Sequence, residues 1–89
     1  MNEKSFVELC KESIVDYHNN HRDKSNPGNG ITVDDVYVVW LCKILKNNKA
    51  LLSTTVEDGM YYEVTYNGDT GEIYLVAYKN WDTVTIKTK

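Results

Sequence analysis

Hydrophobic and polar residues follow two different periods along the 89-residue chain. In the first part, apolar side chains recur every three or four residues, which predicts an amphipathic helix over about residues 5–21. Ser5 followed by Glu8 has the spacing of a capping box, so we expect the helix to begin there. The apolar stripe of this helix consists of Phe6, Leu9, Cys10, Ile14, Tyr17 and His21. We expect this stripe to pack against a sheet.

Residues 22–30 are polar and contain Pro27, Gly28 and Gly30, which predicts a loop. From about residue 31 to residue 86 the period changes to two, and β-branched and aromatic residues dominate. Turn signals divide this part into strands over 36–46, 49–57, 60–66 and 71–78. Residues 81–87 either extend the fourth strand or add a short fifth. The pattern predicts one α+β domain over residues 1–89, with an N-terminal helix packed on an antiparallel meander of four or five strands.

The three turns predict a register for the strands. Asn47-Asn48 and Asp58-Gly59 are two-residue turn signals, and residues 67–70 form a longer turn. This register puts Ile44 opposite Leu51, Thr55 opposite Tyr62 and Val64 opposite Ile73. Alternation then assigns to the helix side Val36, Val38, Trp40, Cys42, Ile44, Leu51, Tyr62, Val64, Tyr66, Ile73, Leu75 and Ala77.

The side of the sheet away from the helix, called the outer face, is predicted to be apolar as well. It combines charged residues with Tyr37, Val39, Leu41, Leu45, Leu52, Val56, Tyr61, Tyr74, Val76 and Tyr78. One helix cannot cover both sides of a sheet, so this face either binds a protein partner or a second copy, or is covered by the loop and the segment containing Trp81. The predicted anchors of an interface are Tyr37, Leu41, Leu52, Tyr61, Tyr74 and Tyr78.

Charge narrows the classes of partner. The net charge is −3 and the isoelectric point is about 5.2, which argues against duplex nucleic acid and against an anionic membrane surface. No apolar run approaches the roughly 20 residues that span a bilayer. The first residues lead into no apolar stretch typical of a secretory signal, so we expect a cytoplasmic protein. Cys10 and Cys42 fit no zinc-binding spacing and are expected to be free, buried thiols.

Two weaker patterns suggest alternative functions. His18 and His21 lie at a helical spacing that lets two imidazoles share a metal ion, which suggests a small metal-dependent enzyme. Outer-face tyrosines near a basic hairpin tip formed by Lys43, Lys46 and Lys49 suggest a binder of single-stranded nucleic acid. No motif identifies catalytic residues, a cofactor or a bound metal, and we expect a protein that is not an enzyme.

The runs Asp35–Trp40, Asn47–Thr54 and Asp58–Gly68 resemble a family of small uncharacterised proteins from phages and prophages of Gram-positive bacteria. The resemblance covers roughly residues 6–80. It implies an intracellular setting in an infected or lysogenic bacterium, and it implies no activity and no functional residues. The order of helix and meander is also similar to that of cystatin-like folds. The sequence thus predicts an accessory protein that acts by binding a host factor, a defence factor or another copy of itself.

Overall fold

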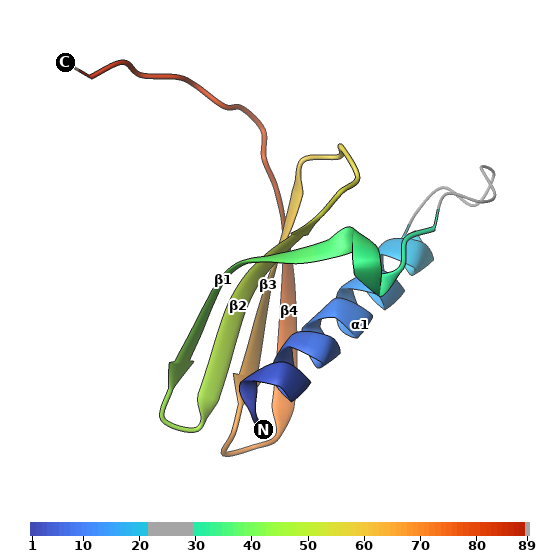
Figure 1. Cartoon of the computed structure of the whole chain (residues 1–89), viewed down its shortest axis with the longest axis vertical. Coiled ribbons are helices and arrows are strands. Elements are labelled where there is room, and N and C mark those ends of the chain that lie inside the picture. Colours follow the sequence, from blue (N-terminus) through green and yellow to red (C-terminus); the bar gives the residue numbers. More distant parts are fainter. Residues whose placement is uncertain (22–29, 89) are drawn as a thin grey trace.

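The computed structural model of the chain describes residues 1–21 and 30–88. One long helix packs on one side of a four-stranded antiparallel sheet with the order β1-β2-β3-β4 (Figure 1). The elements are α1 (Glu3–His21), a short 3₁₀ helix η1 (Val33–Asp35), β1 (Val36–Ile44), β2 (Asn47–Thr54), β3 (Met60–Asn67) and β4 (Glu72–Lys79). The predicted α+β fold is confirmed. The predicted loop 22–30 lies, apart from Gly30, outside the described residues.

The helix α1 begins two residues before the predicted start. The Oδ1 atom of Asn2 accepts a hydrogen bond of 2.8 Å from the backbone N–H of Ser5, so Asn2 fills the capping role that was assigned to Ser5. The predicted stripe faces the sheet, and Phe6, Cys10 and Ile14 are fully buried. No helix in the described part of the chain is both long and apolar enough to span a membrane.

The far end of α1 is fastened to the chain that enters the sheet. The side-chain amide of Asn19 donates a hydrogen bond of 3.1 Å to the carbonyl oxygen of Ile31, and the N–H of Ile31 donates one of 2.9 Å to Oδ1 of Asn19. Ile31 is buried in the core beside this clamp. These two bonds fix how the helix lies on the sheet.

The first hairpin differs from the predicted register in two places. Its turn is Leu45-Lys46, with Leu45 at a φ of 55°, and Asn47 and Asn48 belong to β2, where they lie opposite Ile44 and Lys43. The predicted Asn47-Asn48 turn is therefore wrong. A β-bulge between Val38 and Trp40 also adds one residue to β1, and such an insertion moves the following side chains to the opposite face.

The other two connections shift the pairing in different ways. Leu52 lies opposite Tyr62, so the predicted pairing of Thr55 with Tyr62 is wrong. Val64 lies opposite Leu75 rather than Ile73, a shift of two residues. Because a two-residue shift preserves the alternation, the predicted faces of β3 and β4 are correct.

The core lies between α1 and the inner side of the sheet. Its buried apolar residues are Phe6, Cys10, Ile14, Ile31, Val36, Ala50, Leu52, Tyr62 and Val64. Four residues predicted for this side, Trp40, Cys42, Ile44 and Leu51, instead lie in rows on the outer face or at its rim. Cys42 is consequently exposed, whereas it was expected to be buried.

Residues 80–88 form neither a fifth strand nor a cover over the outer face. They have no regular secondary structure and are exposed, and they lead away from the sheet after β4 (Figure 1). The predicted extension of the fourth strand, the predicted fifth strand and the predicted cover are therefore all absent from the described residues.

Candidate functional site

The outer face consists of three cross-strand rows. The first row contains Tyr37, Ser53, Tyr61 and Tyr78. The second contains Trp40, Leu51, Glu63 and Val76. The third contains Cys42, Lys49, Thr65 and Tyr74. Val39, at the bulge, is also exposed. Aromatic and aliphatic side chains therefore extend across all four strands.

Solvent reaches many of these apolar side chains. Tyr37, Trp40, Tyr74 and Tyr78 are each between 41% and 49% exposed. Val39 and Val76 are exposed to a similar degree. No described segment packs over these rows, because α1 contacts the opposite side of the sheet. On the described part of the molecule, the outer face thus presents apolar side chains from all four strands around a polar centre of Lys49, Glu63 and Thr65, and exposed apolar groups of this extent are a feature of interaction sites.

Four of the six predicted interface residues lie on this surface, namely Tyr37, Tyr61, Tyr74 and Tyr78. The other two are corrections. Leu52 is fully buried in the core, and Leu41 packs partly buried against the core, opposite Ala50. The bulge brings Leu41 to the helix side, and the pairing of Leu52 with Tyr62 places Leu52 there. Sequence reasoning missed Trp40, because alternation without a bulge assigns it to the core.

The two charged residues within the three rows, Lys49 and Glu63, are paired with each other. The Nζ atom of Lys49 lies 3.3 Å from Oε1 of Glu63, across β2 and β3. The three lysines of the predicted basic tip do not lie together on the outer face. Lys43 lies in a helix-side row opposite Asn48, and the Nζ atom of Lys46 lies 3.9 Å from Oδ1 of Asp69. These contacts leave the face without the basic groove that a nucleic-acid strand needs.

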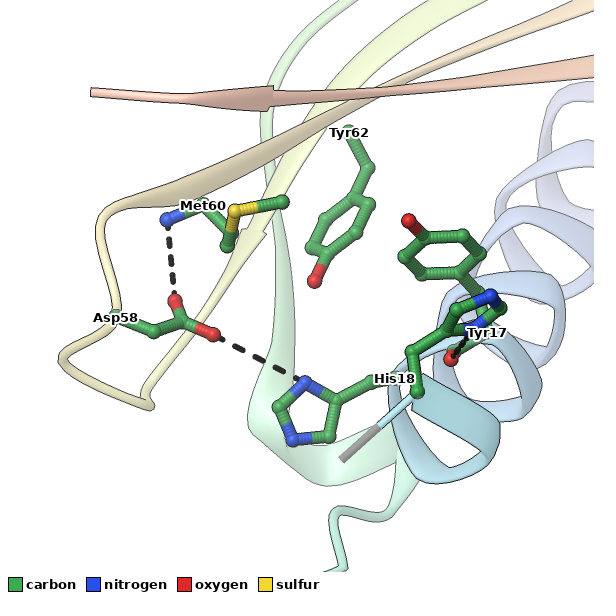
Figure 2. Close-up of a pocket in the computed structure, with 6 residues that line it drawn as sticks. Tyr17, His18, Asp58, Met60 and Tyr62 are labelled. Carbon is green, nitrogen blue, oxygen red and sulfur yellow. Dashed lines mark hydrogen bonds and ion pairs between the residues drawn. The ribbon is translucent and has the colours of Figure 1, made fainter. Parts of the chain in front are cut away.

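A second candidate site is a half-open cavity of about 250 Å³ between the end of α1 and the β2–β3 connection. Its walls are formed by Tyr17, His18, His21, Asp58, Met60 and Tyr62 (Figure 2). Nδ1 of His18 lies 3.9 Å from Oδ2 of Asp58. The other oxygen of Asp58 accepts a 3.0 Å hydrogen bond from the N–H of Met60, so the turn at Gly59 holds this carboxylate toward the helix.

Hydrogen bonds and stacking hold the aromatic groups of this cavity. The Nδ1–H of His21 donates a 2.8 Å bond to the carbonyl oxygen of Tyr17, so Nδ1 carries the donor proton in this contact. The rings of Tyr17 and His21 stack with centroids 4.1 Å apart, and the ring of Tyr62 meets Tyr17 edge-on at 5.8 Å. Burial raises the pKa of the Tyr62 phenol, and Asp58 and Tyr17 raise it further. At neutral pH Tyr62 therefore remains a protonated donor.

The cavity brings together the two histidines that the sequence singled out, and it adds Asp58, which sequence reasoning had assigned to a turn alone. Within residues 1–21 and 30–88, no three His, Cys, Asp or Glu side chains gather closely enough to hold one metal ion. The arrangement can instead hold a small polar group between two imidazoles, a carboxylate and a phenol. No signal along the sequence connects Asp58 with His18, because their proximity arises from packing.

Comparison with known proteins gives one match. A model of a family of unknown function (DUF6275) matches residues 7–88. No curated protein and no solved structure matches the chain.

Proposed function

Because the chain belongs to the DUF6275 family, whose function is unknown, we propose a function from the geometry: it is a protein-binding module that uses its outer face. The single observation that carries this proposal is the uncovered apolar surface across all four strands. Half-exposed Trp40, Tyr37, Tyr74 and Tyr78 are the anchors. Trp and Tyr dominate the energetics of many protein interfaces, since each buries a large area at little conformational cost.

The chemistry of the face favours a protein over a nucleic acid. Lys49, which lies within the rows, is paired with Glu63, and the chain as a whole carries a net charge of −3. Binding to phosphates requires unpaired positive charge. The partner surface that fits this face is flat and apolar, with polar groups placed to meet the Lys49–Glu63 pair.

The biological setting is part of the same proposal. The resemblance of the strand sequences to small phage and prophage proteins supports an accessory role in the cytoplasm of a Gram-positive bacterium, where the partner is a host or defence factor. Binding through the same face to a second copy is the neighbouring version of this proposal. We propose a binding role without catalysis, because the outer face presents mainly aromatic and aliphatic side chains that suit an interface.

A capture experiment tests this proposal. The full chain and a Tyr74→Ser/Tyr78→Ser variant are immobilised and exposed to lysate of a Gram-positive host. A Glu12→Ser/Asp16→Ser variant, altered on the exposed side of α1, is the matched control. We expect proteins that are recovered by the wild type and the control but lost from the outer-face variant. Equal recovery by all three would contradict the proposal, and sedimentation of the pure chain separates a foreign partner from a second copy.

The alternative function, a small metal-dependent enzyme, rests on His18 and His21, which line the same cavity beside Asp58 but form no three-ligand metal site within the described residues. Metal analysis of the purified protein tests it. The enzyme hypothesis expects one bound ion per chain and loss of that ion in His21→Ala. A chain without stoichiometric metal after purification in metal-supplemented buffer would eliminate this alternative.

A further inference from the structure

The segment that follows β4 has the composition of a strand but lacks the pairing of one. Residues 83–88 read Thr-Val-Thr-Ile-Lys-Thr, so five of the six are β-branched, and threonines alternate with Val84 and Ile86. Trp81, Val84 and Ile86 are 87%, 71% and 81% exposed. Such a segment is stabilised most by a partner strand that forms hydrogen bonds with its backbone and buries its apolar side chains.

Bonds around Asn80 direct this segment away from its own sheet. The N–H of Asn80 donates a 2.7 Å hydrogen bond to the carbonyl oxygen of Gly59, which prolongs the course of β4 beyond its last residue. The side chain of Asn80 then accepts from the N–H of Asp82 at 3.1 Å and donates to Oγ1 of Thr83 at 2.9 Å. These two side-chain bonds form a local turn that bends the chain away from β4 (Figure 1), and they open when residues 80–83 extend as a strand.

The free edge of β4 offers a matching template. β4 is the last strand in the sheet order and pairs with β3 on one side. Within the described chain, the backbone groups along its other side meet no strand, and such an edge readily accepts another strand. Residues 72–79 and 81–88 have the same length, so one segment can pair along the whole of β4.

We infer that two copies of this chain exchange residues 81–88, each segment pairing antiparallel with the free edge of the other copy's β4. Each copy then contributes one long strand, β4 and its continuation, and a twofold axis near Asn80 relates the two strands. A symmetric exchange of this kind pairs the free β4 edges of both copies at once and gives a closed dimer. This inference concerns the backbone edge of β4, although the side chains of Val76 and Tyr74 at that edge also belong to the outer face.

The side chains are compatible with this pairing. Centred on Asn80, the antiparallel arrangement sets Val84 beside Val76 and Ile86 beside Tyr74 of the other copy, so exposed apolar groups cover one another. In the same register Asp82 lies opposite Tyr78 and Lys87 lies opposite Ile73, so no two like charges face each other across the new pair of strands.

The exchange has a consequence for the shape of the dimer. When two edge strands pair antiparallel about a twofold axis, the axis is perpendicular to the sheet, and equivalent faces lie on the same side. The two four-stranded sheets would then join into one continuous sheet. The two outer faces become one wider surface, and the two helices lie together on the other side.

Sedimentation equilibrium of the full chain measures the association. We expect a mass of about twice the 10.3 kDa of the monomer at micromolar concentration. Val84→Pro removes an N–H from the new ladder, and it should return the mass to that of the monomer. Val84→Thr, which keeps the β-branched shape, should retain the dimer. Because Val84 is exposed in the single chain, neither substitution disturbs the fold.

Disulfide trapping identifies which segments meet. Two Cys42→Ser proteins, one carrying Val76→Cys and the other Val84→Cys, are mixed and oxidised. The inference expects cross-links that join one protein to the other, in clear excess over cross-links within either protein alone. A strict monomer at all concentrations, or a Val76→Cys/Val84→Cys double variant that closes its disulfide within one chain, would overturn it. Neither result depends on whether the outer face binds a foreign protein.

Discussion

Trp40 lies directly opposite Leu51, and both side chains belong to the middle row of the outer face. Trp40 is 41% exposed there. The residue that follows Leu51, Leu52, is fully buried on the helix side of the sheet. Two neighbouring leucines therefore have different roles: Leu51 supports an exposed surface and Leu52 fills the core.

This difference predicts the result of one matched pair of substitutions. Leu52→Ala removes a buried side chain and should lower the free energy of unfolding by about 2–5 kcal/mol. Leu51→Ala removes a half-buried side chain and should lower it by about 1 kcal/mol. Urea denaturation followed by circular dichroism measures both. A larger loss for Leu51→Ala than for Leu52→Ala would contradict the observed register.

Leu45 is predicted to be a source of strain. Its φ of 55° lies in the left-handed region, which disfavours side chains with a Cβ atom, and its own side chain is 89% exposed. Leu45→Gly should therefore raise the free energy of unfolding by about 1 kcal/mol, because it relieves the strain and sacrifices little packing. Thermal and urea denaturation test this change.

The control for that substitution is the preceding residue. Ile44→Gly introduces the same residue into β1, outside the left-handed region, and should lower stability, because glycine weakens a strand. If both substitutions change stability in the same direction, the assignment of the turn to Leu45-Lys46 is wrong.

The two cysteines should differ in reactivity and in their effect on stability. Cys42 is exposed and Cys10 is buried, so maleimide should modify Cys42 quickly and Cys10 only on unfolding. Burial raises the pKa of the Cys10 thiol from 9.0 to about 12. Between those values the unfolded chain releases a proton that the folded chain keeps. The free energy of unfolding should therefore fall as pH rises from about 9 to 12.

Cys10→Ala provides the control for this pH dependence. The variant lacks the titrating thiol, so its stability should fall less steeply than that of the wild type over the same range of pH. Denaturation curves at a series of pH values give the comparison. If the free energy of unfolding falls with pH equally steeply in the wild type and in Cys10→Ala, the Cys10 thiol is not protected by burial.

The negative charge of Asp58 is predicted to raise the pKa of the Tyr62 phenol. Burial is the largest cause of the raised pKa of Tyr62, and the negative charge of Asp58 is the next. Asp58→Asn keeps an oxygen that accepts from Met60 but removes the charge, so the pKa of Tyr62 should fall while staying above its ordinary value of 10.0. Ultraviolet titration measures it, with Tyr62→Phe to assign the transition and Asp69→Asn as the control.

The sequence was sufficient for the helix and for the strands β3 and β4. The stripe through Phe6, Cys10 and Ile14 has one period throughout, and it identifies the buried side of α1. On β3 and β4 the predicted register was shifted by two residues, and the alternation tolerated that shift. Tyr74 and Tyr78 were therefore placed correctly on the outer face.

The sequence was insufficient for the first hairpin, for identifiable reasons. Leucine is a poor signal for a left-handed turn, so Leu45 was assigned to a strand, and Asn47-Asn48, a strong turn signal, lies in β2. The bulge at Val39 has no marker either, since valine is typical of regular strands. The bulge exchanged Trp40 and Leu41 between the faces, whereas the displaced turn changed which residues of β1 and β2 pair. The cavity at His18 and Asp58 depends on packing between segments that are distant in the sequence. The spacing of apolar and polar residues along the chain does not predict such contacts.

The central claim, that the outer face binds a protein, has a natural reporter in Cys42. This exposed thiol lies in the row with Lys49, Thr65 and Tyr74. Its rate of maleimide modification can be measured in the pure dilute chain and in host lysate. A Cys42→Ser/Glu12→Cys variant, whose thiol lies on the exposed side of α1, corrects for competition by other thiols. We predict that lysate slows the modification of Cys42 but not of the control thiol. An equal rate at both positions would contradict the claim.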